Sequence, residues 1–442
     1  MTIATANPTA WSFYQKLGFR FFCCLFLIYI LPFPLDSIPF INEITGLSEK
    51  MGQWYGAIFE GYTALWHAII PWFAKHVLHL DKPITIFSNG SGDTTYDYVL
   101  LLFFILLAFL GSIVWTVLDR KRPSYNQAHY WLRAALRYYL AGMMFVYGII
   151  KIYHLQMPFP YLSQLVQPFG DKSPMGLAWS FIGYSKGYSA FSGIAELIGG
   201  ILLLFRRTTL VGAITVAIVM LNVAMLNYFY DVPVKLFSSM LVIMSVFLII
   251  PDFKRLGNLF FFNKPVTATT FPSMISSRKF RIARVVLKLL IISSLFYSNI
   301  SNGISSTKSY GDKRELPPLY GIYNSEIVVR NGDTIPPLMT DTARWRQLII
   351  QFKDNAQVKI MNDSLKRFNF EVDTVAKQVQ LYQNNDTLNR SMFTYKVDSS
   401  ELVLNGVWNK DTLYMKFRKY DINKFRLVSR GFNWINEYPY NR

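Results

Sequence analysis

The chain has 442 residues, of which 52% are hydrophobic and 16% are charged, with a formal net charge of +18. Soluble domains carry more charge and fewer aromatic residues, so this composition excludes an ordinary soluble protein and indicates an integral membrane protein. The positive charge does not indicate nucleic-acid binding, because the basic residues gather at the ends of apolar segments, as in "DRKRP" (119–123) and "SRKFRIAR" (277–284).

Apolar segments along the chain predict about seven membrane-spanning helices. They lie near 20–37, 97–118, 131–152, 188–205, 209–228, 233–250 and 284–302. Most of them reach the roughly 20 residues that a bilayer helix needs. Prolines in "LPFPLD" (31–36) predict a kink in the first helix. The Trp-rich stretch 51–80 is amphipathic and predicts a helix that lies on the membrane interface or packs against the bundle.

The basic loops predict the orientation of these helices. Lys16 and Arg20 precede the first segment, and further basic loops follow at alternate turns, so the N-terminus is expected in the cytoplasm. The predicted location is the cytoplasmic (inner) membrane, with the lipid bilayer as a partner. The same count places the residues after 302 outside the cytoplasm, which is the periplasm if the source is a Gram-negative bacterium.

The composition changes after a polar linker at 301–318. Short alternating runs fill 320–442, from "GIYNSEIVV" to "FRLVS", and predict a small antiparallel sheet or barrel. Turns are expected at Asn331-Gly332-Asp333, Asn384-Asn385-Asp386, Asn405-Gly406 and Asn409-Lys410-Asp411. The predicted domains are an N-terminal membrane extension (1–130), a four-helix membrane domain (131–252), a basic loop with one further helix and a linker (253–310), and an extracytoplasmic β-rich domain (311–442).

A lysine and a glutamate fall inside the predicted membrane helices. Lys151 lies near the outer end of 131–152, and Glu196 lies about two turns in from the outer end of 188–205. An outer loop joins these two segments, so they can lie side by side with the lysine in reach of the glutamate. Ionisable residues in a membrane pair with one another and mark candidate functional sites, which makes both residues candidate catalytic groups. An ion pair that only links two helices is the alternative.

Other polar and aromatic residues are expected near the outer ends of the same helices. The candidate ligand-binding residues are His154, Tyr147, Trp179, Tyr188, Asn222, Asn227, Asp231 and Lys235. Motifs for phosphate loops, nucleophile elbows and zinc proteases are missing, and two adjacent cysteines cannot form a tetrahedral metal site. The sequence therefore predicts no metal site and leaves open whether the chain is an enzyme.

Two segments resemble the DoxX family of small bacterial membrane proteins. They are "YLAGMMFVYGIIKI" (139–152) and "FSGIAELIGGILLLFRRTTLVGAI" (191–214), and the matching positions are Gly148, Lys151, Glu196, Gly199, Gly200, Arg206 and Arg207. The resemblance covers roughly 131–252 and implies a four-helix membrane domain with a quinone-like or isoprenoid ligand nearby. In the tail, "PPLYGIYN" (317–324) is similar to the opening strand of lipocalin-like barrels, with Tyr323 in place of a tryptophan.

These observations predict an all-α polytopic membrane bundle with a DoxX-like four-helix core, followed by a β-rich soluble domain with a lipocalin-like barrel as one form. One functional hypothesis is a redox-associated protein that binds a quinone-like or isoprenoid ligand near Lys151 and Glu196, with a redox protein as partner. The alternative is a non-catalytic, membrane-anchored binding or assembly protein whose β-rich tail binds a lipid, peptide or protein. No nucleic-acid partner is expected.

Overall fold

The computed structural model describes residues 10–87, 90, 92–266, 277–383 and 386–441. Internal contacts divide the chain into two compact units. The first, which we call the membrane unit, comprises Met1–Gln156 and Lys186–Ser306, and the second, the barrel unit, comprises Met157–Ser185 and Thr307–Arg442. The segment 157–185, which the sequence placed within the membrane domain, thus groups with the barrel.

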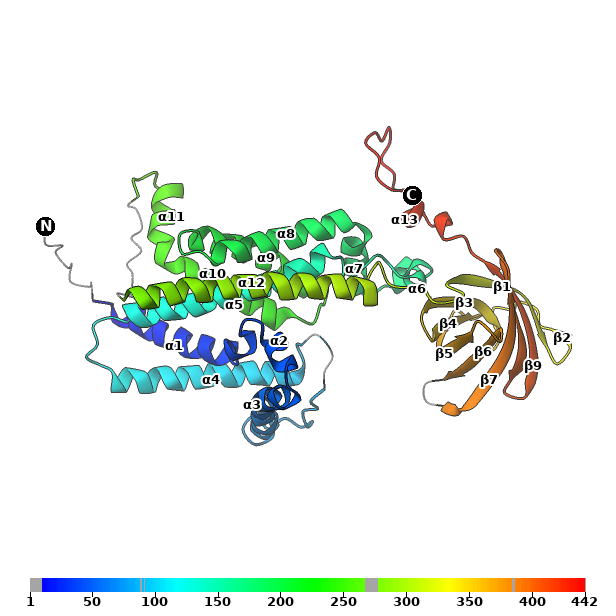
Figure 1. The fold of residues 1–442 in the computed structure, drawn as a ribbon, viewed down its shortest axis with the longest axis horizontal. Coiled ribbons are helices and arrows are strands. Elements are labelled where there is room, and N and C mark those ends of the chain that lie inside the picture. Colours follow the sequence, from blue (N-terminus) through cyan, green and yellow to red (C-terminus); the bar gives the residue numbers. More distant parts are fainter. Residues whose placement is uncertain (1–9, 88–89, 91, 267–276, 384–385, 442) are drawn as a thin grey trace. The chain divides into compact units, whose positions relative to one another are not determined.

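Helices, most of them long, make up the membrane unit (Figure 1). They are α1 (Phe13–Ile30), α2 (Ile41–Gly46), α3 (Glu49–His76), α4 (Thr95–Leu118), α5 (Asn126–Ile152), α8 (Lys186–Leu203), α9 (Thr209–Phe229), α10 (Lys235–Ile249), α11 (Phe253–Phe260) and α12 (Arg278–Ser309). Short polar motifs set where some of these helices begin. Ser12 and Gln15 form a reciprocal capping box at α1, and Thr94 and Asp97 form another at α4, which satisfies backbone N–H groups of the first turn.

The predicted fold class is wrong in its number of membrane helices and in its description as an all-α bundle. In the described residues, five helical segments are long and apolar enough to cross a membrane: Phe13–Ile30, Thr95–Leu118, Asn126–Ile152, Thr209–Phe229 and Lys235–Phe260. The predicted segments 188–205 and 284–302 fall in α8 and α12, which are not among these five. α8 contains Lys186, Glu196 and several glycines and serines, and α12 begins and ends with polar residues.

Of two N-terminal predictions, the kink in the first helix is wrong and the helix within 51–80 is confirmed. α1 ends at Ile30, so the prolines of 31–36 follow the helix and do not kink it. The amphipathic stretch 51–80 forms most of α3, which is seen nearly end-on in Figure 1 while α4 and α5 lie lengthwise.

α5 lies at the centre of the packing in the membrane unit. Its Leu136, Leu140 and Met144 are fully buried in one hydrophobic core, together with Phe26 of α1 and Leu248 of α10. Lipid is as apolar as these side chains, so they stabilise a bundle in a membrane mainly through close van der Waals packing.

Glycines bring α5 and α8 into backbone contact. A Cβ atom placed on Gly148 of α5 would lie only 2.7 Å from the carbonyl oxygen of Gly193 in α8, and a Cβ on Gly193 would meet the carbonyl of Gly148. Small residues at this position therefore serve close helix packing.

The C-terminal sheet of the barrel unit is a closed, eight-stranded antiparallel barrel, which settles the choice between sheet and barrel. Its strands are β1 (Gly321–Arg330), β3 (Trp345–Phe352), β4 (Asn355–Ile360), β5 (Leu365–Asp373), β6 (Gln378–Gln383), β7 (Asp386–Val397), β8 (Glu401–Trp408) and β9 (Asp411–Lys419). Each strand pairs with the next, and β1 pairs with β9, for example Val328 opposite Met415, which closes the ring. The short β2 (Asp333–Thr334) forms a hairpin with β1.

Side chains fill the interior of the barrel. Alternate residues of each strand point inward, as the period of two requires, and Phe370, Phe393 and Phe417 are almost completely buried there with Tyr323 and Leu348. The closed barrel is compatible with a lipocalin-like form. Its interior is a packed hydrophobic core.

Shorter helices complete the barrel unit. They are α6 (Leu162–Leu165), α7 (Pro174–Tyr184) and α13 (Arg426–Ser429). Leu162 of α6 packs against Ile322 and Ile349 of the barrel wall, so the segment after residue 156 covers part of its outer surface.

Candidate functional site

The predicted pairing of Lys151 with Glu196 is confirmed. Lys151 lies in the last turn of α5, Glu196 lies in α8, and Lys151 Nζ donates a hydrogen bond to Glu196 Oε1. The two side chains are 7% and 1% exposed, so bulk water does not screen the pair. Glu196 Oε2 is buried with no hydrogen-bond partner in the described residues. This arrangement is compatible with both the functional and the structural role that the sequence left open.

The other predicted site residues do not form one group around this pair. His154 follows α5 and is buried, and Tyr188 lies on α8 with half of its surface exposed. Trp179 belongs to α7 of the barrel unit. Asn222 is exposed on α9, whereas Asn227 is buried and donates to Val234 O and Ser238 Oγ. Asn227 therefore joins α9 to α10.

Asp231 and Lys235 lie at the turn from α9 to α10. Lys235 Nζ is 3.0 Å from Asp231 Oδ1 and 3.9 Å from Asp93 Oδ2. The Asp93 carboxylate also accepts hydrogen bonds from the backbone N–H groups of Lys235 and Leu236, at 2.6 and 3.0 Å. Asp93 thus caps α10 from a distant loop, a role that its sequence position did not indicate.

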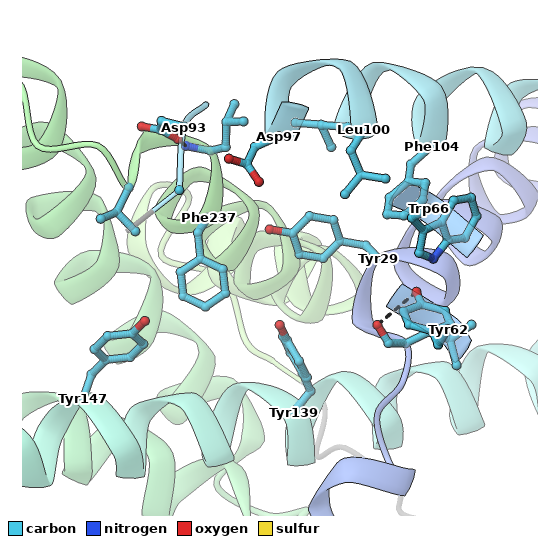
Figure 2. Close-up of a pocket in the computed structure, with 15 residues that line it drawn as sticks. Tyr29, Tyr62, Trp66, Asp93, Asp97, Leu100, Phe104, Tyr139, Tyr147 and Phe237 are labelled. Atoms are coloured by element: carbon cyan, nitrogen blue, oxygen red, sulfur yellow. Dashed lines mark hydrogen bonds between the residues drawn. The ribbon is translucent and has the colours of Figure 1, made fainter. Parts of the chain in front are cut away.

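A cavity of about 430 Å³ opens between α1, α3, α4, α5 and α10 (Figure 2). We call it the tyrosine cavity. Its lining residues are Tyr29, Leu31, Tyr62, Trp66, Gly92, Asp93, Asp97, Leu100, Leu101, Phe104, Tyr139, Tyr147, Val234, Leu236 and Phe237. The volume is within the range of small-molecule sites, and the walls are apolar with a few polar atoms, as such sites require.

Three tyrosine hydroxyls converge on this cavity. Figure 2 shows Tyr29 of α1 and Tyr139 and Tyr147 of α5 pointing into it from two sides. None of these hydroxyls has a hydrogen-bond partner among the described residues. The buried Nε1 of Trp66 also has no hydrogen-bond partner at an ordinary distance and angle among these residues. A buried indole N–H normally has a partner, and tyrosine hydroxyls that line a cavity without a protein partner are free to bind a ligand that accepts hydrogen bonds.

Two carboxylates and one anchored tyrosine complete the polar lining. Asp97 accepts hydrogen bonds from the backbone N–H and the hydroxyl of Thr94, and its carboxylate lies near the Tyr29 hydroxyl in Figure 2. The Tyr62 hydroxyl donates to Leu31 O at 3.3 Å. These bonds hold the rim in place and leave the hydroxyls of Tyr29, Tyr139 and Tyr147 as adjustable donors or acceptors.

Sequence reasoning found one residue of this cavity, Tyr147, and missed the rest. The eight-residue spacing of Tyr139 and Tyr147 is compatible with one helix face and was a usable signal. Tyr29, Trp66 and Asp97 come from three other elements, and no local pattern brings these together. Among the described residues there is also no group of three or more His, Cys, Asp and Glu residues that could hold a metal ion.

Comparison with known proteins gives one relative that shares most of its length with this chain. It is the uncharacterized protein YwoB of Bacillus subtilis, 32% identical over 136 residues, which are 29% of this chain and 80% of that protein. No family model matches the chain. No solved structure matches it either.

Proposed function

We propose that this chain, which belongs to the same family as the uncharacterized protein YwoB of Bacillus subtilis, is a multi-pass membrane protein that binds an amphipathic small molecule in the tyrosine cavity. One observation carries the proposal. The hydroxyls of Tyr29, Tyr139 and Tyr147 and the indole N–H of Trp66 face an apolar-walled cavity without hydrogen-bond partners of ordinary geometry in the described part of the chain.

A quinone-like headgroup is the ligand class that suits this lining best. Its carbonyl oxygens accept hydrogen bonds from tyrosine hydroxyls and indole N–H groups, and its flat ring can lie against Phe104 and Phe237. When bound, a quinone would supply reversible electron and proton chemistry. The protein's own residues would bind the headgroup, orient it and exclude water from it. The resemblance to the DoxX family supports the same ligand class and a redox protein as partner.

The Lys151–Glu196 pair is a second element of the proposal. Tyr147 lies close enough to Glu196 to be affected by its charge, so one tyrosine connects the cavity to the ion pair. A carboxylate oxygen without a partner can accept a hydrogen bond from a nearby donor. We propose that the pair adjusts the electrostatics of the Tyr147 side of the cavity.

The proposed location is the cytoplasmic membrane, with the N-terminus in the cytoplasm and the barrel on the other side. The exposed basic residues at 119–123 and 277–284 support this orientation under the positive-inside rule. The barrel could still bind a lipid, peptide or protein. Because Phe370, Phe393 and other core residues fill its interior, such a partner would contact its outer surface.

Ligand extraction from the purified protein tests the proposal. We expect a quinone or isoprenoid in the organic extract of the wild-type protein, identified by mass spectrometry. The variant Tyr29→Phe/Tyr139→Phe loses two hydrogen bonds of about 0.5–1.5 kcal/mol each. Its affinity for an added short-chain quinone should fall by roughly 5- to 150-fold.

The matched control is Tyr138→Phe, on the same helix and next in sequence to Tyr139, but outside the cavity. It should keep the wild-type ligand content and affinity. An extract without any such lipid, together with equal quinone affinity in wild type and the double variant, would rule the proposed site out.

A further inference from the structure

Five basic side chains lie together at one end of the membrane unit. Arg133 and Arg137 belong to α5, Arg206 lies in the turn between α8 and α9, and Arg284 and Lys288 belong to the first half of α12. Arg137 lies within electrostatic range of Arg133 and Arg206, and Lys288 within range of Arg137 and Arg284. We call these five residues the basic cluster.

Aromatic contacts fix the two flanks of the cluster. Lys288 Nζ lies 3.9 Å from the centre of the Phe205 ring, and Arg206 Cζ lies 5.1 Å from the centre of the Tyr130 ring. These are cation–π distances. α12 is held against the bundle by the rings of Phe296 and Phe145, whose centres are 4.9 Å apart.

Arg137 is buried in the bundle and Arg133 is partly buried, unlike loop charges that only set membrane orientation. Arg137 is 9% exposed, and its Nε donates to Leu203 O, the last carbonyl of α8, at 2.9 Å. Arg133 Nη2 donates to Leu248 O near the end of α10, at 3.3 Å. The Nε of Arg133 is buried and has no partner among the described residues.

Among the described residues, Arg133, Arg137 and Lys288 lack a matching set of negative charges. The carboxylate of Asp252 interacts electrostatically with Arg133. Asp252 is already bound by Arg255, whose Nη1 lies 2.5 Å from Asp252 Oδ1. The charges that act most strongly on Arg137 and Lys288 belong to other cations and to tyrosines. Placing like charges together in a partly dehydrated site is costly unless an anion compensates them.

We propose that the basic cluster binds a phosphate group, carried by the headgroup of an anionic phospholipid or by free phosphate. Guanidinium groups bind phosphate oxygens through paired hydrogen bonds, and basic pockets between membrane helices bind lipid headgroups. The surface beside the cluster suits acyl chains, because Phe205, Phe280 and Val285 are exposed on it. This proposal does not depend on the tyrosine cavity.

Thermal unfolding of the detergent-purified, full-length protein tests it. The protein is titrated with phosphatidylglycerol, with phosphatidylcholine and with inorganic phosphate. Phosphatidylglycerol should raise Tm in a saturable way, and more than phosphatidylcholine at equal concentration. The variants Arg137→Gln and Lys288→Gln should each raise the half-saturating concentration about fivefold or more, because one cation contributes about 1 kcal/mol to such binding.

The control is Lys279→Gln, an exposed basic residue at the start of α12 that lies outside the cluster. It should behave like the wild type. A saturable Tm increase with inorganic phosphate, and none beyond phosphatidylcholine with phosphatidylglycerol, identifies free phosphate as the ligand. An equal increase in Tm with all three additives would overturn the proposal. An equal loss of phosphatidylglycerol affinity in Lys279→Gln and Lys288→Gln would overturn it as well. Lys288→Gln keeps the test valid if Arg137→Gln does not fold, because Lys288 is less buried.

Discussion

The Lys151–Glu196 pair joins two helices through a hydrogen-bonded ion pair that is nearly inaccessible to water. Burial of two charges has a desolvation cost that their attraction offsets only while both partners are present. Removal of either charge leaves the other without compensation. Stability measurements on both single variants and the double variant can therefore separate a structural role from a functional one.

We expect Glu196→Leu and Lys151→Met to lower the free energy of unfolding by about 3–5 kcal/mol each. The double variant should lose less than either single variant, because no buried charge remains. Denaturant unfolding in detergent measures these values. Asp231→Asn, which breaks an exposed pair with Lys235, is the control and should cost under about 1 kcal/mol. If the losses of the two single variants simply add in the double variant, the pair contributes no coupling.

A second residue-level prediction concerns Asp398 in the turn between β7 and β8. Its carboxylate accepts hydrogen bonds from the backbone N–H groups of Ser400 and Glu401, which lower the pKa of Asp398. The folded-state pKa lies below the unfolded one, so ionised Asp398 contributes its full stabilisation above the ordinary aspartate pKa of about 3.9. The contribution is lost as the pH falls through the lowered value.

The variant Asp398→Asn should therefore unfold more easily than the wild type at pH 7, and the difference should shrink toward pH 2–3. Tyrosine and tryptophan fluorescence during denaturant unfolding gives both values. Glu437→Gln, an exposed change in the C-terminal segment, should show no such pH-dependent difference. A constant difference between Asp398→Asn and wild type across this range would contradict the argument.

At the scale of elements, the contact between α5 and α8 depends on the absence of side chains. Gly193→Ala would place a methyl group against the Gly148 carbonyl, so we expect a loss of about 1–3 kcal/mol in the free energy of unfolding. Gly142 lies on the same α5 helix, and a methyl group there would meet no atom of another element within 4 Å, so Gly142→Ala should be neutral or stabilising by about 0.5–1 kcal/mol. Comparable losses in both variants would show that the close contact between Gly148 and Gly193 does not decide the outcome.

The elements of the barrel were largely predictable from sequence. Alternation of inward and outward residues identified the eight strands, and Asn409 and Lys410 form the expected turn with positive φ angles of 51° and 75°. Asn405-Gly406 was wrongly predicted as a turn and lies within β8, where Gly406 is close to the Met392 carbonyl of β7. The run "FRLVS" was wrongly predicted as a strand and contains α13. The predicted turn at Asn384-Asn385 lies outside the described residues.

The candidate site was less predictable, for a physical reason. Lys151 and Glu196 are unusual residues in apolar segments, and charge alone made them noticeable. The tyrosine cavity is assembled from α1, α3, α4, α5 and α10, and each contributes one or two aromatic residues that look like ordinary membrane-interface residues. Which of them face a shared space depends on helix packing, which a single sequence does not specify.

For the whole molecule, the proposed orientation predicts which surface positions contact which compartment. Single cysteines would report on opposite sides of the membrane when Cys23 and Cys24 are first replaced by serine. The two positions are Val375, in the exposed turn between β5 and β6, and Lys121, in the loop between α4 and α5. A membrane-impermeant maleimide should label Val375→Cys in cells whose cytoplasmic membrane is intact, after any outer membrane has been permeabilised. Lys121→Cys should react only after lysis. The reverse pattern, or labelling of both positions before lysis, would contradict the proposed orientation.

Closure of the barrel through β1 and β9 also affects how such a protein can evolve. Because the first and last strands are neighbours, with Tyr323 opposite Lys419, the chain enters and leaves the domain at adjacent points. A domain with adjacent ends can be gained, lost or exchanged as a cassette, since the surrounding chain needs no rerouting. The strands alone meet this condition, whereas the segment 157–185, which packs on the barrel wall, ties the barrel unit to the chain between α5 and α8.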